Sequence, residues 1–324
     1  MLIYENALWL LLAVLLLDAV VGDPDWLWRR LPHPVVWIGN LISLFDRKLN
    51  RTSSRSESRK NAGLALLLVL VFGGLILGGV LHLVLARIPF GEALIVVVAA
   101  VFIAQNSLYR HVAAVRDGLE SGGLEGGRKA VAMIVGRDPA QLDEPGVSRA
   151  AIESCAENFS DGVVAPVFWF ALLGLPGLLA YKAVNTADSM IGHKNETYQD
   201  FGWASARFDD LINLPASRLS GVFIALCAPL AHGSIRRAIT CMVRDAKLHR
   251  SPNAGWPEAA MAGALDIALA GPRTYPGYTV DDPYMNEAGR IEATANDIDR
   301  AVIVMIAACG VQALLVLLIA VLIR

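Results

Sequence analysis

The sequence predicts an all-α, polytopic membrane protein. Of its 324 residues, 55% are hydrophobic and only 18% are charged, and the mean hydropathy is +0.49. This balance is too apolar for an ordinary soluble domain. A helix needs about 20 residues to cross a bilayer, and several apolar stretches of this chain reach or approach that length. We therefore expect a helical bundle with four to six membrane segments, some of them broken or re-entrant, and helical cytoplasmic loops.

Charge and cysteine content exclude other classes. The net charge is −2, so no basic excess indicates a nucleic acid partner. The four cysteines form no C-x-x-C pair, and neither a zinc ribbon nor a disulfide framework is predicted. Glu5 is the only charge before Asp18. Because a signal peptide begins with a basic region, we expect the N-terminal apolar stretch to be retained as the first span.

Four stretches are the clearest membrane segments. Roughly, these are 7–21, 62–86, 301–323 and the shorter 93–104, which reaches span length if it continues to residue 108. The sequence RIPFGE precedes residue 93 and is a tight Pro/Gly turn. This turn predicts a hairpin between segments 62–86 and 93–104.

Two further apolar segments, 162–183 and 211–231, are interrupted by proline and glycine. Broken helices occur at membrane depth where they are buried in protein or line a cavity. If both segments span, the chain has six spans and residues 184–210 lie outside. If neither spans, it has four, and every large polar loop is cytoplasmic. The sequence leaves both alternatives open.

The polar loops predict the orientation of a single integral membrane domain, 1–324. Its large loops are 22–61, 109–161, 184–210 and 232–300. Lys and Arg number eight in 22–61, six in 109–161 and eight in 232–300, but only one in 87–92. The positive-inside rule then places the N-terminus outside and the three basic loops in the cytoplasm. We expect a multi-pass cell-membrane protein whose active loops face the cytoplasm.

The first loop contains an amphipathic pattern. In HPVVWIGNLISLFDRKLNR, apolar residues recur at helical spacing and basic residues follow. This pattern predicts a helix lying in the membrane interface. Residues 51–60, RTSSRSESRK, are expected to be a solvated basic linker.

A run of acids precedes the first broken segment. Residues 148–158 are expected to be helical, which places Glu153 and Glu157 on one face, with Asp161 one step further. Like charges at this spacing repel unless they are solvated, paired or bridged by a cation such as Mg²⁺. The alternative is an exposed acidic helix end, with Asp161 as the N-cap of the next helix.

The stretch 181–213 is dense in polar groups. Asn185 and Asp188 lie one turn apart if it is helical, His193 and Lys194 lie in a compact polar turn, and Arg207 follows. Cations on phosphate oxygens and carboxylates on a metal are what phosphoryl chemistry requires. A membrane-flanking loop with incidental salt bridges is the alternative.

Two other groups are candidates on weaker local grounds. A small-residue helix is expected at 256–270, and Ser251, Asn253 and Glu258 gather at its N-terminal end, where anions bind favourably. A structural cap is the alternative. His33 lies between two prolines, as in many purely structural turns. No P-loop, G-x-G-x-x-G, H-E-x-x-H or G-x-S-x-G motif is present.

Four stretches together resemble the cobalamin biosynthesis family called CobD or CbiB, adenosylcobinamide-phosphate synthase. They are GDPDWLWRRLPHPVVWIG, ESCAENFSDGVVAPVFW, YKAVNTADSMIGHKNETYQDFGWASARFDD and HRSPNAGWPEAAMAGAL. The resemblance covers nearly the whole chain in order. It implies a membrane enzyme that joins adenosylcobyric acid to (R)-1-aminopropan-2-ol or its O-phosphate through an ATP-driven amide bond.

The resemblance also implies partners and roles. Mg²⁺ and ATP are expected as metal and co-substrate, with no tightly bound organic cofactor, and other late cobalamin enzymes of the membrane are possible partners. The expected catalytic residues are Glu153, Glu157, His193 and Lys194, and the metal candidates are Asp161 and Asp188. The substrate or nucleotide candidates are His33, Asn158, Asn185, Arg207, Ser251, Asn253 and Glu258. The competing interpretations are a transporter of corrinoids or a non-catalytic membrane regulator.

Overall fold

The computed structural model describes residues 6–51, 55–136, 138–275, 278–280 and 282–323. It contains helices and only four short strands among these residues, so the all-α prediction is confirmed. The chain forms two compact units. The first comprises Met1–Ala104, Ala165–Asn213 and Val316–Arg324, and the second comprises Gln105–Val164 and Leu214–Leu315. The predicted single domain, 1–324, stays a prediction.

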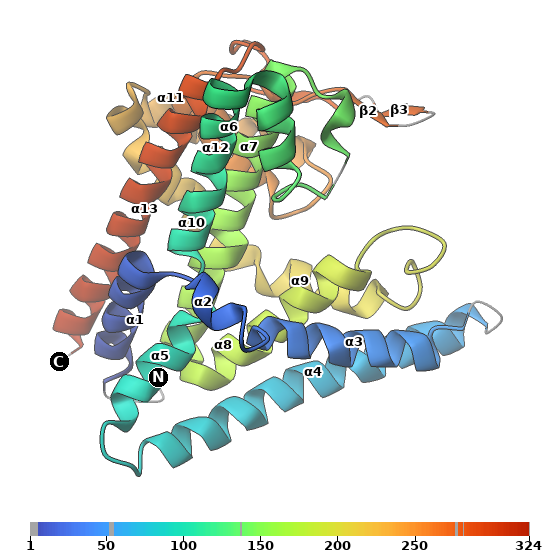
Figure 1. The fold of residues 1–324 in the computed structure, drawn as a ribbon, viewed down its shortest axis with the longest axis vertical. Helices are drawn as coiled ribbons and strands as arrows, with labels where there is room; N and C mark the ends of the chain where they lie inside the picture. Colours follow the sequence, from blue (N-terminus) through green and yellow to red (C-terminus); the bar gives the residue numbers. More distant parts are fainter. Residues whose placement is uncertain (1–5, 52–54, 137, 276–277, 281, 324) are drawn as a thin grey trace. The chain divides into compact units, whose positions relative to one another are not determined.

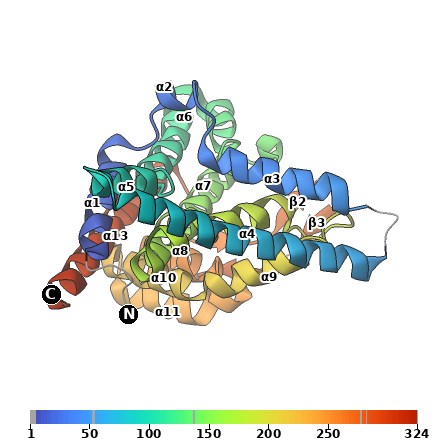
Figure 2. The same ribbon diagram turned by 90° about the horizontal axis from the view of Figure 1, so that it is seen from below.

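Every regular element in the described part of the first unit is a helix (Figure 1). Its helices are α1 (Ala7–Val21), α2 (Asp25–Trp28), α3 (Pro34–Leu49), α4 (Ser56–Leu85), α5 (Gly91–Ala100), α8 (Ala165–Ile191) and α9 (Trp203–Ile212). Helices α3 and α4 lie side by side, and α4 packs along α8 and α9 (Figures 1 and 2). Their core includes Ile42, Leu66, Ile191 and Phe201. The predicted amphipathic helix of the first loop is confirmed as α3, and part of its apolar face packs against protein.

Close approach of α4 and α8 depends on two glycines. A Cβ atom at Gly74 would lie 2.6 Å from the Cα of Ala180, and one at Gly78 would lie 2.5 Å from the Cα of Pro176. Small residues that let helix backbones touch are typical of membrane helix interfaces. Within α8 the backbone leaves helical geometry at Gly174, where φ is 65°, just before Pro176. The broken-helix prediction for 162–183 is therefore confirmed.

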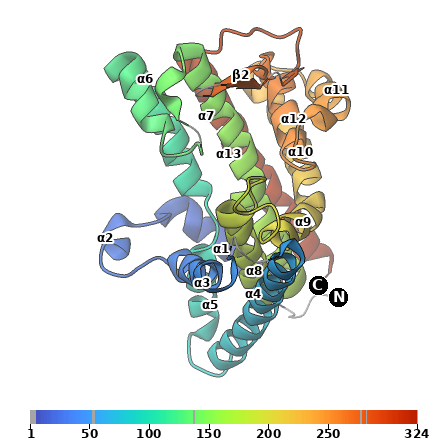
Figure 3. The same cartoon turned by 90° about the vertical axis from the view of Figure 1, so that its right-hand side faces the viewer.

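The second unit contains the remaining elements (Figure 3). They are α6 (Gln105–Val131), η1 (Pro139–Gln141), α7 (Glu144–Phe159), η2 (Ser160–Val164), α10 (Leu214–Cys227), η3 (Ala228–Ala231), α11 (Ile235–Asp245), η4 (Ala246–Leu248), α12 (Gly255–Leu265) and most of α13 (Ala295–Leu322). The strands are β1 (Leu269–Ala270), β2 (Arg273–Tyr275), β3 (Tyr278–Val280) and β4 (Tyr284–Met285), paired β1–β4 and β2–β3, both antiparallel. Helix α12 packs against α10 and α11.

Five segments of the described chain are long and apolar enough to cross a membrane. They are Ser56–Leu85, Gly91–Val131, Glu144–Ile191, Leu214–Ala231 and Ala295–Leu322, and the apolar helix Ala7–Val21 is shorter. These segments agree with the predicted range of four to six. Orientation and the side on which 184–210 lies stay predictions.

Three local expectations are wrong. Residues 51–60 are not all a solvated linker, because α4 begins at Ser56 and Arg59 is only 7% exposed. The expected helix 256–270 ends at Leu265, since Asp266 adopts a left-handed conformation that Asp tolerates better than most residues. Asp161 does not cap a new helix. It lies in the π-helical turn η2, which follows α7 and leads into α8 without a break.

Candidate functional site

The predicted site residues divide between the two units. The first unit holds His33, Asn185, Asp188, His193, Lys194 and Arg207. The second unit holds Glu153, Glu157, Asn158, Asp161, Ser251, Asn253 and Glu258. Each group is therefore built from its own helices. The two metal candidates, Asp161 and Asp188, belong to different units.

In the first unit, α8 and α9 present an acidic cluster of Asp188, Asp209 and Asp210. Asp209 is only 7% exposed, and its carboxylate accepts hydrogen bonds from Asn213 Nδ2 at 2.9 Å and Asn185 Nδ2 at 3.5 Å. The helical placement of Asn185 and Asp188 one turn apart is confirmed. The side-chain amides of Asn213 and Asn185 thus hold Asp209, the most buried carboxylate of the cluster.

Burial raises the pKa of both acids on α9, and repulsion by neighbouring acids adds to this at Asp209. Burial raises the pKa of Asp209 to about 7, the negative charge of Asp188 adds to this, and the amide hydrogen bonds oppose it. Burial also raises the pKa of Asp210, although the positive charges of Arg207 and Lys194 oppose that rise. Arg207 Nη1 lies 3.9 Å from Asp210 Oδ2, and its side chain is 66% exposed. The cluster concentrates negative charge, with the exposed cations Arg207 and Lys194 at its edge.

The loop that carries His193 and Lys194 is held by a buried arginine. Arg59 on α4 donates from Nη2 to the carbonyl oxygens of Glu196, at 3.2 Å, and of Thr197. Its Nε donates to Asn50 Oδ1 at 2.8 Å, and Asn50 Nδ2 in turn donates to the Thr197 oxygen at 3.0 Å. His193 and Lys194 themselves are exposed. The loop backbone is therefore anchored while its two candidate side chains remain accessible.

A second set of contacts fixes the far end of this loop. Asp200 accepts a hydrogen bond from Ser56 Oγ at 2.8 Å and lies 3.6 Å from Lys60 Nζ. Tyr198 donates its hydroxyl to Asp46 at 3.3 Å. Burial and the charge of Asp46 raise the pKa of Tyr198, so the hydroxyl remains a donor. Residues of α3 and α4 thus determine the loop conformation.

His33 has an evident structural task. Its Nδ1 accepts the N–H of Val35 at 3.2 Å and so caps α3. Its ring meets Trp28 edge-on at 4.5 Å between centroids, and Nε2 lies 3.8 Å from Asp23 Oδ1. The structural-turn alternative describes these contacts well, while the predicted substrate role stays a prediction.

In the second unit, the acid run of α7 has unequal environments. Glu153 is buried and accepts the N–H of Ala270 at 2.8 Å, which ties α7 to β1. Glu157 is exposed and Asp161 is half-buried in η2. Asn158 donates to the Ser154 oxygen at 2.9 Å, within its own helix. π-helical turns are frequent at functional sites. Glu157 lies just before the π-helical turn η2, and Asp161 lies within it.

The other predicted group gathers where α10 meets the start of α12. Ser251 Oγ accepts the N–H groups of Asn253 and Ala254, both at 3.2 Å. Glu258 is 2% exposed, with Oε1 3.7 Å from His249 Nε2. The spatial proximity expected for Ser251, Asn253 and Glu258 agrees with these contacts. Their role as substrate or nucleotide ligands stays a prediction.

An arginine cluster, which sequence reasoning missed, lies in the same place. It consists of Ser217, Arg218, Asn253 and Trp256. Arg218 Nη1 donates to Asn253 Oδ1 at 2.7 Å and Ser217 Oγ at 2.9 Å, and its guanidinium lies 4.6 Å from the Trp256 ring centroid. A lone Arg within an otherwise apolar segment was the available signal.

The described residues hold no group of three or more His, Cys, Asp or Glu side chains arranged as a metal site. Mg²⁺, however, commonly uses one or two carboxylates and completes its shell with water and substrate phosphates. The acidic cluster supplies carboxylates of that kind. Its donor set therefore fits Mg²⁺ bound together with a phosphate-bearing substrate better than a metal held by protein alone.

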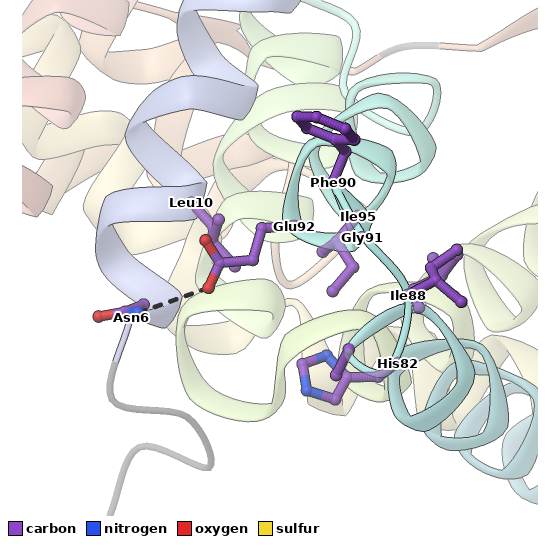
Figure 4. A pocket seen from close by; sticks show the side chains of 10 residues that line it. Asn6, Leu10, His82, Ile88, Phe90, Gly91, Glu92 and Ile95 are labelled. Carbon is purple, nitrogen blue, oxygen red and sulfur yellow. Dashed lines mark hydrogen bonds between the residues drawn. The ribbon is translucent and has the colours of Figure 1, made fainter.

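Two hollows of the first unit contain none of the predicted residues. One, of about 510 Å³, is lined by Asn6, His82 and Glu92 among apolar residues, and Asn6 lies 3.5 Å from Glu92 (Figure 4). The other, of about 140 Å³, is apolar and bordered by Tyr181 and Ile212. Tyr181 donates its hydroxyl to Asn213, the residue that also bonds Asp209. This small hollow thus adjoins the support of the acidic cluster.

Comparison with known proteins gives a consistent result. Residues 10–305 match the family described as CobD/Cbib protein. The chain is 57% identical over 319 residues to a protein of Sinorhizobium sp named "Cobalamin biosynthesis protein CobD", covering 98% of this chain and 99% of that one. Proteins of the same name from Sinorhizobium fredii and Rhodobacter capsulatus are 59% and 48% identical over 302 and 270 residues, covering 92% and 83% of this chain and 92% and 84% of theirs. No solved structure matches the chain.

Proposed function

This chain belongs to the CobD/Cbib protein family, and on that premise we propose that it is the adenosylcobinamide-phosphate synthase of cobalamin biosynthesis. The reaction joins a propionate carboxylate of adenosylcobyric acid to the amine of (R)-1-aminopropan-2-ol or of its O-phosphate. ATP drives the new amide bond. The observation that best supports this chemistry is the acidic cluster with Lys194 and Arg207 at its edge.

The reaction has two difficulties. A carboxylate is a poor acyl donor, so its oxygen first takes the terminal phosphoryl group of ATP, and ADP leaves. The amine, once it has lost its ammonium proton, attacks the acyl carbon, and phosphate leaves. Positioning and charge stabilisation supply most of the rate in such reactions, and a base must accept the proton.

The residues of the first unit suit the phosphoryl half of this reaction. Asp188 and Asp210 would hold Mg²⁺, which when bound neutralises charge on the ATP phosphates. Lys194 and Arg207 are exposed cations beside Asp210 and can contact phosphate oxygens. His193 lies close enough to Asp188 for the two side chains to interact electrostatically, and is assigned to phosphate contact. Asn185 orients the carboxylate of Asp209.

The residues of the second unit suit the remaining tasks. Glu157 is an exposed carboxylate near the end of α7 and is assigned to proton removal from the amine, with Asp161 as a further metal candidate. Glu153 is buried against β1, so we assign it a positioning role. Ser251, Asn253 and Glu258 are assigned to substrate contacts, and the membrane supplies an apolar surface for the bulky corrin ring.

The test is product formation by the full chain in detergent. The mixture contains adenosylcobyric acid, Mg²⁺-ATP and either free or phosphorylated aminopropanol, and mass spectrometry identifies the amide. We expect an amide from wild type and none from Glu157→Gln. Product from both would keep the enzyme and remove Glu157 from the essential residues. No product with either amine, from protein shown to be folded, would refute the proposal.

A transporter of corrinoids is the second candidate, and the break of α8 at Gly174 favours it, since broken helices line transport sites. A transporter would move corrinoid across sealed vesicles without changing it. A non-catalytic regulator would do neither. ATP consumption that depends on adenosylcobyric acid and the amine separates the synthase from both.

A further inference from the structure

Arg218 is a positive charge that the fold surrounds with neutral groups. Its Nη1 donates to Asn253 Oδ1, Ser217 Oγ and the Leu214 oxygen, at 2.7, 2.9 and 3.2 Å. Its face lies against the Trp256 ring, 4.6 Å from the centroid. Within the described part of the chain, no carboxylate forms an ion pair with Arg218.

Several other buried or half-buried arginines pair with a carboxylate. Arg59 Nη1 lies 3.9 Å from Asp200 Oδ2, Arg300 Nη1 lies 2.9 Å from Asp297 Oδ1, and Arg116 pairs with Asp299. Arg218, by contrast, stands in the apolar segment Leu214–Ala231. A charge placed there without a counter-charge is costly and marks a functional site by default.

The geometry leaves one edge of the guanidinium available. The described residues accept no hydrogen bond from Nε or Nη2 of Arg218, so three N–H groups remain unused, and two of them lie in parallel on the Nε–Nη2 edge. The side chain is only half-buried, which leaves that edge accessible. Buried Ser217 and Asn253, at 0% and 6% exposure, fix the opposite edge, and Trp256 fixes the plane.

We propose that the Nε–Nη2 edge of Arg218 binds a phosphate group. Two parallel N–H donors match two phosphate oxygens. A phosphate monoester or diester brings at least one negative charge, which is enough to neutralise the arginine. The group comes either from a soluble phosphate ester or from a phospholipid headgroup. Its use in catalysis rests on the proposed function, but its binding does not require turnover.

Binding is measured by calorimetry on the full chain in an uncharged detergent, with no ATP turnover. The probes are O-phosphorylated aminopropanol, free aminopropanol, Mg²⁺-free ATP and propionate. Wild type is expected to bind a phosphate-bearing probe at least tenfold more tightly than Arg218→Gln. Arg218→Lys keeps the charge but loses the two parallel N–H donors. Its affinity for the probe is expected to lie between those of wild type and Arg218→Gln. Arg236→Gln removes an exposed arginine of α11 and is expected to bind like wild type.

Native mass spectrometry of the same preparations tests the lipid source. If wild type retains a phospholipid that Arg218→Gln and Arg218→Lys lose, and soluble phosphates do not bind, the headgroup supplies the phosphate. Equal binding of all probes and lipids by wild type and both Arg218 variants would overturn the proposal. Tighter binding of propionate than of any phosphate would also overturn it, because the site would then be a carboxylate site.

The outcomes distinguish this inference from the synthase proposal. Loss of phosphate binding in the Arg218 variants of a chain that makes no amide would keep the inference and refute the proposed function. If wild type makes the amide but its phosphate affinity does not depend on Arg218, the proposed function is kept and this inference is refuted. Thermal melting of each variant shows that it is folded, and Arg218→Lys preserves the test if Arg218→Gln unfolds.

Discussion

The acidic cluster of the first unit and the arginine cluster of the second have opposite electrostatic needs. In the acidic cluster, three carboxylates share one neighbourhood, and burial with repulsion raises the pKa of Asp209 to about 7. In the arginine cluster, the partners of the guanidinium among the described residues are all neutral. One cluster is therefore suited to a cation and the other to an anion. A chain that uses Mg²⁺ and phosphate-bearing substrates needs both.

The largest expected effect is on the acidic cluster. Asp188→Asn keeps the shape of the side chain but removes a charge assigned to Mg²⁺. The rate of amide formation should fall at least about 100-fold, as when one electrostatic stabiliser is lost from an active site. The control is Asp117→Asn, on an exposed part of α6. A full rate in Asp188→Asn would remove this residue from the metal site.

The anchored loop comes next. Arg59→Gln removes the donors to the Glu196 and Thr197 oxygens and should lower kcat about tenfold with a smaller change in KM, because His193 and Lys194 lose their position. It should also lower the free energy of unfolding by about 2–3 kcal/mol, as charged hydrogen bonds of a buried group are lost. Asp200 pairs with both Arg59 and the exposed Lys60. Lys60→Gln removes only the second of these ion pairs and should cost under about 1 kcal/mol. Equal melting temperatures for the two variants would contradict this account of the loop.

Asp209 predicts how stability depends on pH. Its folded-state pKa is raised from 3.8 to about 7, so the folded protein binds more protons than the unfolded chain between these values. The contribution of Asp209 to stability should therefore be greatest below about pH 4 and fall as pH rises to about 7. Above that pH it should level off, after a total loss of at most about 4 kcal/mol. Melting of wild type and Asp209→Asn in EDTA, from pH 4 to 8, measures this. The same slope in both proteins would show that another group titrates.

The smallest effect concerns the arginine cluster. Trp256→Phe keeps an aromatic face under Arg218 but weakens the cation–π contact, which is worth about 0.5–1 kcal/mol at such sites. Affinity for the phosphate-bearing probe should fall two- to fivefold in calorimetry. Trp203→Phe changes an exposed ring of α9 and should leave the affinity unchanged. An unchanged affinity in Trp256→Phe would show that the ring does not orient the guanidinium.

The sequence predicted the helical elements well because their signals are local. Apolar length identified the membrane segments, and Pro176 beside two glycines identified the break in α8. Arg59 was assigned to a solvated linker because its partners, the Glu196 and Thr197 oxygens, lie more than 130 positions away. The end of α12 was missed because Asp266 takes a left-handed conformation without a glycine.

The candidate site was predicted only where its residues are close in sequence. Ser251, Asn253 and Glu258 are neighbours in sequence, and the structure keeps them together. Asp209 and Asp210 follow Arg207 in the polar stretch 181–213, but the burial of Asp209 and its contact with Asn185 on another helix have no local signal. The environment of Arg218 on α10 depends on Asn253 and Trp256, which are more than 30 positions away in sequence and contact it only in the folded chain. Long-range packing, rather than composition, creates both features.

The central claim is that one amide-forming reaction uses a cation site and an anion site of opposite charge. Initial rates of amide formation, measured against Mg²⁺ and against phosphorylated aminopropanol in Asp188→Asn and Arg218→Gln, test it most directly. The account predicts that Asp188→Asn raises the Mg²⁺ concentration for half-maximal rate, whereas Arg218→Gln raises the KM of a phosphate-bearing substrate and leaves the Mg²⁺ dependence unchanged. A wild-type chain that makes no amide, or two variants that shift the same parameter alike, would contradict it.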